Sequence, residues 1–71
     1  MNTLRVIIKP AEDQYAAYAE NADGVYGYGE SIGKTLQSLL DSIRKLKAYT
    51  PGKVPEILKG AYNIEVVNLC F

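Results

Sequence analysis

Residues 25–36 read Val-Tyr-Gly-Tyr-Gly-Glu-Ser-Ile-Gly-Lys-Thr-Leu, and this stretch decides the fold because it leads from a short strand into a helix. Ser31 is placed as the helix N-cap, since its hydroxyl accepts a hydrogen bond from a free amide of the first turn, and Glu30 sits beside the positive helix end. We expect the helix to run from Ile32 to about Ala48. Its apolar residues fall within an arc of about 120°, which requires a second layer to lie on: Ile32, Leu36, Leu39, Leu40, Ile43 and Leu46.

On both sides of this helix, apolar and polar residues alternate, which is the pattern of half-buried strands. Pro10 is expected to end the first strand, and residues 21–24 supply a turn between the second and the third. Successive strands joined by such short turns form an antiparallel meander. We expect strands at residues 3–9, 14–20, 25–29 and 62–67.

The predicted fold class is α+β, in the order β-β-β-α-β, with an antiparallel sheet that carries one helix on one face. The helix is expected to lie on five side chains that share this face: Leu4, Val6, Ile8, Ile64 and Val66. The opposite face stays open, and its candidates are Ile7, Val67 and several of the tyrosines Tyr15, Tyr18, Tyr26 and Tyr28. An aromatic face of this kind is typical of a contact surface, but tyrosine is also an ordinary strand residue.

Length and composition limit the classes of protein. The chain has 71 residues, eight basic and eight acidic, and therefore no formal net charge. One domain, residues 1–71, is expected, and because its core is small we expect a homo-oligomer or a complex. No apolar run approaches the roughly 20 residues that span a bilayer, and residues 1–10 lack a secretory signal, so we expect a cytoplasmic protein without a membrane partner.

The charges are unevenly distributed along the chain. Residues 1–43 hold three basic and six acidic residues, whereas residues 44–59 hold five basic residues and one acidic residue. A dipolar surface of this kind can steer charged partners, although an ordinary solvated surface also has such patches.

Residues 27–35 match a phosphate-binding loop in composition but not in spacing. The loop needs four residues between its first glycine and Gly-Lys-Thr, whereas Gly29 leaves three and Gly27 leaves five. The chain has no histidine, so Ser31, Ser38 and Ser42 have no base to activate them, and zinc or iron has no plausible ligand set. The single cysteine, Cys70, is expected to be packed or incidental. We therefore expect a protein that is not an enzyme and holds no cofactor or metal.

The run from Tyr15 to Leu36 resembles, without a gap, the N-terminal domain of the HicB antitoxin family. Gly24 falls on the turn glycine of that family, and residues 29–31 fall on the Gly-x-Thr/Ser that opens its helix. Val25 stands where the family usually has cysteine. The resemblance covers residues 3–48 and implies a β-β-β-α-β fold, which in this family is a partial RNase H-like fold without the catalytic carboxylates of that enzyme.

The resemblance also implies a function. In typical members this domain binds the HicA toxin, a small basic RNA-cleaving protein, and occludes its active site, while a separate C-terminal segment binds operator DNA. We expect that DNA-binding segment to be absent here and predict a protein-binding domain whose partner is a HicA-like toxin. The predicted partner-binding residues are the acidic and aromatic side chains around the second turn: Tyr18, Glu20, Asp23, Tyr26, Tyr28 and Glu30.

Two alternatives stay open. An RNA-binding module would use exposed tyrosines for base stacking and four basic residues for phosphates: Arg44, Lys45, Lys47 and Lys53. These basic residues are expected away from the tyrosines, so we do not expect this domain alone to bind nucleic acid. A purely structural domain would associate with its own copy through the open sheet face or through an edge strand, and the apolar ending at residues 69–71 is expected to pack against another surface.

Overall fold

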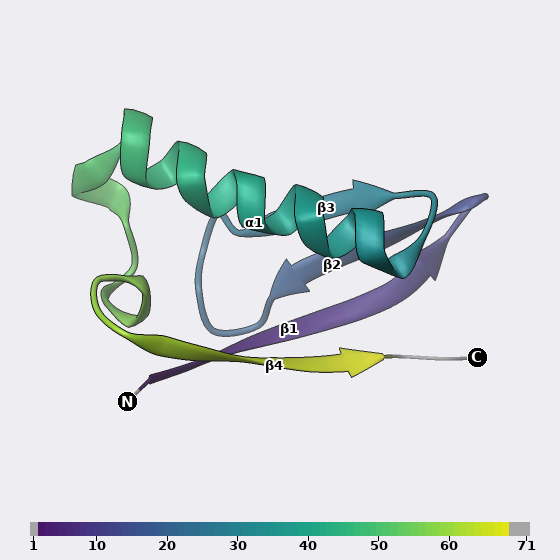
Figure 1. The fold of residues 1–71 in the computed structure, drawn as a ribbon, viewed down its shortest axis with the longest axis horizontal. Helices are drawn as coiled ribbons and strands as arrows, with labels where there is room; N and C mark the ends of the chain where they lie inside the picture. Colours follow the sequence, from purple (N-terminus) through teal and green to yellow (C-terminus); the bar gives the residue numbers. More distant parts are fainter. Residues whose placement is uncertain (1, 69–71) are drawn as a thin grey trace.

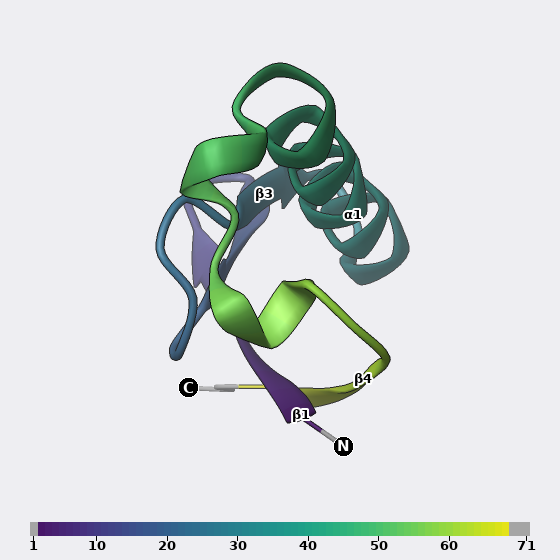
Figure 2. The ribbon, with the colours of Figure 1, turned by 90° about the vertical axis from the view of Figure 1, so that its left-hand side faces the viewer.

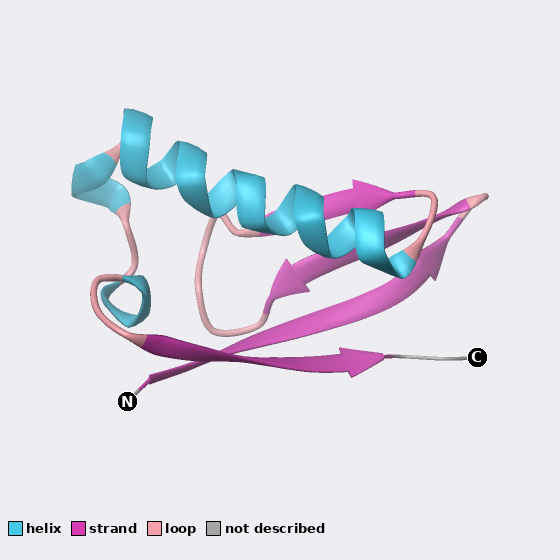
Figure 3. Cartoon of the chain, viewed as in Figure 1, coloured by secondary structure: helices cyan, strands magenta, loops and turns pink. Residues whose placement is uncertain are grey.

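The computed structural model describes residues 2–68, in which three strands are followed by one long helix and a fourth strand (Figures 1 and 3). The predicted order β-β-β-α-β is confirmed. Two short 3₁₀ helices, η1 and η2, lie between the helix and the last strand. The elements are β1 (Asn2–Ala11), β2 (Gln14–Ala19), β3 (Tyr26–Gly29), α1 (Ile32–Tyr49), η1 (Pro51–Lys53), η2 (Glu56–Leu58) and β4 (Tyr62–Asn68).

The sheet is mixed, so the prediction of a wholly antiparallel sheet was wrong. The strand order is β3-β2-β1-β4, and β4 pairs with β1 in parallel, from Asn2 opposite Tyr62 to Ile8 opposite Asn68. The cause is the length of α1, whose 18 residues span about 27 Å and carry the chain back along the sheet to the end where β1 begins (Figure 1). The next strand therefore starts beside the start of β1 and runs in the same direction.

Pro10 does not end the first strand. It pairs with Tyr15, and Ala11 pairs with Gln14, before a turn in which Asp13 takes a positive φ of 54°. The described part of β4 pairs with β1 only as far as Ile8, so no residue of 2–68 pairs with Pro10 on that side of β1. Proline has no amide proton, so a strand tolerates it where no neighbouring strand needs a hydrogen bond from that position.

The core lies between α1 and the sheet. Leu39 and Ile43 from the helix are buried against β1 residues Leu4, Val6 and Ile8. The predicted apolar stripe of α1 is only partly confirmed, because Ile32 and Leu40 remain exposed while Thr35 is fully buried. The helix thus turns its Thr35 side, and not its Leu40 side, toward the sheet.

The predicted helix face of the sheet is covered only in part. Leu4, Val6 and Ile8 are buried, but Ile64 and Val66 are 43% and 40% exposed, although their register with Leu4 and Val6 places them on the same face. The physical reason is the position of α1, which lies over β3 and β2 and away from β4 (Figure 2).

Backbone contact between α1 and β3 explains this position. A Cβ atom on Gly27 would lie 2.4 Å from the amide nitrogen of Leu39, and one on Gly29 would lie 2.6 Å from the amide nitrogen of Thr35. No side chain fits at either place, so the helix backbone rests directly on the strand. Gly27 and Gly29 therefore permit the close approach of the helix to β3.

No helix among residues 2–68 has both the length and the apolar character needed to cross a membrane. The predicted packing of the apolar ending, and the prediction for Cys70, concern residues that lie outside the described range.

The glycine contact gives a stability prediction. Gly27→Ala should lower the free energy of unfolding by at least about 2 kcal/mol, because the new methyl group must push the helix off β3. Gly33→Ala is the matched control: it lies in α1 with nothing within 4 Å of its Cβ position and should stabilise the protein by up to about 1 kcal/mol. Urea unfolding followed by circular dichroism measures both, and equal effects would contradict the proposed contact.

Candidate protein-binding face

Three tyrosines lie on the sheet face that α1 does not cover. Tyr18 on β2 stands opposite Tyr26 on β3, and Tyr28 follows two residues later on the same side. They are 40%, 56% and 56% exposed, and the rings of Tyr26 and Tyr28 meet edge to face with centroids 6.2 Å apart. We call these three residues the tyrosine face. Tyr15 lies on the other side of the sheet, where it packs against the core.

Aliphatic side chains adjoin the tyrosine face. Ile7 on β1 is paired with Tyr18 on one side and with Val67 on the other, and it is buried although no other element within residues 2–68 covers this face. The ammonium of Lys9 stands 5.8 Å from the centre of the Tyr18 ring, a cation–π contact that restrains the ring. The face therefore combines an apolar base with partly ordered, amphipathic rings.

The predicted acidic residues are not gathered in one place. Glu20 follows β2 and lies 3.6 Å from the guanidinium of Arg5, whereas Glu30 follows β3 and lies 3.6 Å from the ammonium of Lys34. Asp23 is in the loop between these two strands, where the structure gives it no ion pair among the described residues. Two of the three carboxylates thus already have a cation of their own, in exposed pairs of the weak kind.

Asn21 fixes the start of the loop that carries Asp23. Its side-chain oxygen accepts a hydrogen bond from the amide of Arg5 at 3.0 Å, and its side-chain nitrogen donates one to the carbonyl of Thr3 at 2.8 Å. The side chain thereby continues the pairing with β1 beyond the end of β2. This ordering keeps the tyrosine face and the Asp23 loop in a fixed relation.

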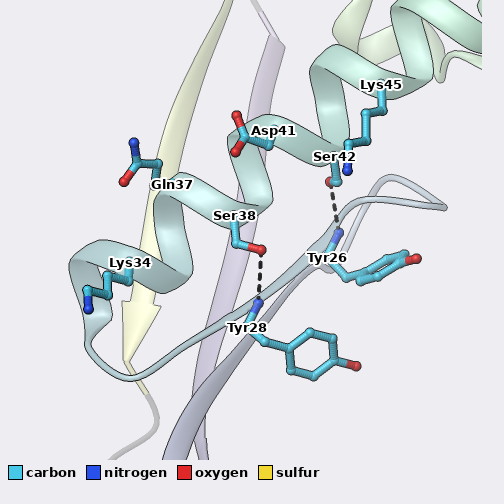
Figure 4. A pocket seen from close by; sticks show the side chains of 8 residues that line it. All are labelled: Tyr26, Tyr28, Lys34, Gln37, Ser38, Asp41, Ser42 and Lys45. Carbon is cyan, nitrogen blue, oxygen red and sulfur yellow. Dashed lines mark hydrogen bonds between the residues drawn. The ribbon is translucent and has the colours of Figure 1, made fainter.

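A groove of about 350 Å³ separates the β3 tyrosines from the exposed side of α1 (Figure 4). At its base, the hydroxyl oxygens of Ser38 and Ser42 accept hydrogen bonds from the amides of Tyr28 and Tyr26, each at 3.3 Å. β3 is an edge strand, and these serines satisfy amides that would otherwise be free. Gln37, Lys34, Asp41 and Lys45 also line the groove.

Ser38 and Ser42 were not predicted to lie beside the tyrosines. From the sequence they were considered only as possible nucleophiles, yet with Thr35 they form a polar row at helical spacing. The Thr35 hydroxyl donates to the carbonyls of Ser31 and Gly29, which ties the same side of α1 to the end of β3. The spacing was the available signal, because a short polar row beside an apolar stripe fits a helix that flanks a strand edge.

The start of α1 is organised as predicted. Ser31 is the N-cap and accepts a hydrogen bond from the amide of Lys34 at 3.2 Å, so Gly33 and Lys34 are inside the helix. The amide of Lys34 is therefore already used within the protein and does not point at a ligand. Among residues 2–68, no three His, Cys, Asp or Glu side chains come together in a metal-binding arrangement.

The edge contact can be tested one amide at a time. Ser38→Ala should make the amide of Tyr28 exchange its hydrogen at least about fivefold faster, because a hydrogen bond worth about 1 kcal/mol is lost. Gln37→Ala changes the neighbouring residue, which lines the groove without bonding β3, and should leave that rate unchanged. Amide hydrogen exchange measured by NMR gives both rates. Equal rates in the two variants would contradict the hydrogen bond between the Tyr28 amide and the Ser38 hydroxyl.

A scan against protein-family models and searches of curated proteins and of solved structures gave no match.

Proposed function

We propose that this chain is a non-catalytic protein-binding domain, similar to the toxin-neutralising domain of HicB antitoxins, whose partner is a small basic protein such as a HicA-like toxin. The observation that carries the proposal is the tyrosine face. Tyr18, Tyr26 and Tyr28 are exposed together on a sheet face that no other layer covers within residues 2–68. Tyrosine is among the residues most enriched at the energetic centres of protein interfaces.

The rigidity of the tyrosine face supports this proposal. Tyr26 and Tyr28 belong to a strand whose backbone is held by β2 on one side and by Ser38 and Ser42 on the other. A partner that covers these rings therefore has little backbone order to impose on binding. A segment whose backbone is fixed in advance loses less entropy on association, which favours affinity.

The acidic residues are proposed to guide the partner. Asp23, which has no ion pair in the described structure, and Glu20 lie near one end of the tyrosine face, and Glu30 lies near the other. A basic protein would approach this half of the chain faster than a neutral one. Because Glu20 and Glu30 already pair with cations of their own, we assign the affinity to the rings and only the association rate to the carboxylates.

The tyrosines should dominate binding to such a partner. Tyr26→Ala and Tyr28→Ala should each raise the dissociation constant for a HicA-type toxin by about 30-fold, which corresponds to about 2 kcal/mol. Calorimetry at physiological salt measures this change.

Tyr49→Ala is the matched control, because Tyr49 is 80% exposed but lies at the end of α1, off the tyrosine face. It should leave the dissociation constant within twofold of the unmodified value, a difference of about 0.4 kcal/mol or less. Equal losses in all three variants, or no binding by the unmodified protein, would refute the proposal.

RNA remains a second candidate, because Lys34 and Lys45 line the same groove as Tyr26 and Tyr28. Of the four basic residues singled out from the sequence, Lys47 instead faces Tyr62, 5.6 Å from its ring centre. Lys34 and Lys45 thus lie in one groove with two rings on which bases could stack, but two cations and two rings make a small site for a nucleic acid.

A salt titration separates RNA from protein as the ligand. We expect weak binding of single-stranded RNA that Lys45→Ala does not change. If RNA is the ligand, affinity should instead fall steeply between about 50 and 200 mM salt, and Lys45→Ala should reduce the steepness of that fall by about one unit of log–log slope. Fluorescence anisotropy with labelled RNA measures both quantities.

A further inference from the structure

The two edges of the sheet differ in their protection. The β3 edge is closed by Ser38 and Ser42 from α1, whereas β4 is the last strand on the other side. Among the described residues, no hydrogen bond is made to the outer edge of β4. A strand edge with free amides and carbonyls is a template for pairing with another chain.

β4 also lacks the features that usually prevent such pairing. Its seven residues, Tyr62–Asn68, contain no lysine and no proline, and their only charge is Glu65. Ile64 and Val66, on the helix side of the strand, are exposed over about two fifths of their surface. Natural edge strands are commonly protected by an inward charge, a proline or a bulge.

One flank of α1 extends this apolar surface. Leu36, Leu40 and Lys47 lie within a narrow arc of the helix at 100° per residue, and the contact of Lys47 with Tyr62 shows that this flank is the one on the β4 side. Leu36 is half-buried and Leu40 is exposed. We call Ile64, Val66, Leu36 and Leu40 the β4 flank.

From these observations we infer that β4 is a self-association surface, on which a second copy of this chain pairs its own β4 antiparallel to the first about a twofold axis. Antiparallel pairing of one strand with itself is self-complementary, as a twofold interface requires. The result is a continuous eight-stranded sheet with both helices on one side, and the β4 flanks of the two copies meet at the axis. This inference goes beyond the proposed function and leaves both tyrosine faces free.

The charge distribution favours a second copy as the occupant. Residues 44–59, with five basic residues and one acidic residue, lie at the end of the molecule where β4 begins, and the β1–β2 turn with Glu12 and Asp13 lies at the opposite end (Figure 1). Antiparallel pairing along the long axis places the basic end of each copy beside the acidic end of the other. The net charge of zero also removes any overall repulsion between copies.

A stable dimer needs only a modest share of the surface. A stable interface buries at least about 1,200 Å² in total, or about 600 Å² from each copy. That share is about an eighth of the 4808 Å² that the described protein exposes. β4 supplies the strand pairing, and the exposed Leu40 supplies additional area on the helix.

One register fits the charges best. Centring the pair on Glu65 would place two carboxylates opposite each other, which is destabilising. Centring it on Ile64 places the two Ile64 side chains together at the axis, Tyr62 opposite Val66 and Glu65 opposite Asn63 of the second copy. Centring it on Val66 also separates the carboxylates, but it places the apolar Ile64 opposite the polar Asn68. We assign the Ile64-centred register.

Sedimentation equilibrium from low to high micromolar concentration tests the inference. The unmodified protein should reach twice the 7.8 kDa of one chain. Ile64→Lys should raise the dissociation constant of the dimer by at least about tenfold, because it replaces the apolar contact at the axis with two facing charges. Asn63→Lys is the matched control: it adds the same charge on the other face, opposite Glu65 of the second copy, and should leave the dimer as tight or tighter.

Two further variants keep the outcomes distinct. In a Cys70→Ser background, Ile64→Cys should form a disulfide-linked dimer on oxidation, because the two introduced thiols face each other across the axis. Tyr26→Glu should leave the sedimentation mass at that of the dimer. Failure of the protein-binding proposal and failure of the dimer proposal are therefore separate results. The inference is overturned if the unmodified protein stays at the monomer mass, or if Ile64→Lys, shown to be folded by circular dichroism, remains as dimeric as Asn63→Lys.

Discussion

The structure depends on direct contact between the backbone of α1 and the backbone of β3. Gly27 and Gly29 provide it, because any larger residue at either place would overlap the helix main chain. At this short separation, Ser38 and Ser42 can reach the amides of Tyr26 and Tyr28. The same two glycines thus set both the packing distance and the closure of one sheet edge, while Tyr26 and Tyr28, which alternate with them in the sequence, point to the opposite face.

Placing the helix over β3 has a cost for the rest of the sheet. One helix covers about two strands, and here those strands are β3 and β2. β1 is still buried, because Leu58 from η2 and Val54 join its cover. β4 receives little cover, and its Ile64 and Val66 stay exposed. Residues 2–68 contain no second α-helix to cover that half of the sheet, so its apolar side chains stay exposed.

Much of the local structure was predictable from the sequence, because it follows from local physics. The Ser31 cap, the extent of α1 and the alternation in the strands depend on residues within a few positions of one another. The direction of β4, the exposure of Leu40 and the bonding of Ser38 to β3 depend instead on how distant elements meet. Pro10 shows the same limit, since its place in β1 depends on the pairing of the sheet, in which the described part of β4 reaches only as far as Ile8.

The candidate site also combines features set by local sequence with features set by contacts between distant elements. Alternation placed Tyr26 and Tyr28 on one side of β3, but the pairing of Tyr18 with Tyr26, the position of Tyr15 on the core side and the capture of Glu20 by Arg5 all require the register of the sheet. An acidic residue counted from the sequence is therefore a poor guide to the charge that a partner meets. The exposed area of a tyrosine ring is a better guide to what a partner meets, because only burial removes it, whereas a carboxylate can also be neutralised by a neighbouring cation.

The two exposed surfaces differ in chemistry in a way that suits different partners. The tyrosine face is amphipathic, and interfaces that form and dissociate between stable proteins are polar enough to remain compatible with water when free. The β4 flank offers aliphatic side chains and a bare strand edge, which resembles the more apolar surface of permanent homodimers. In the proposed dimer, the two tyrosine faces lie on the same side of one continuous sheet. A partner that is itself dimeric would then bind its second site at a high effective concentration, and would bind more tightly than either site alone allows.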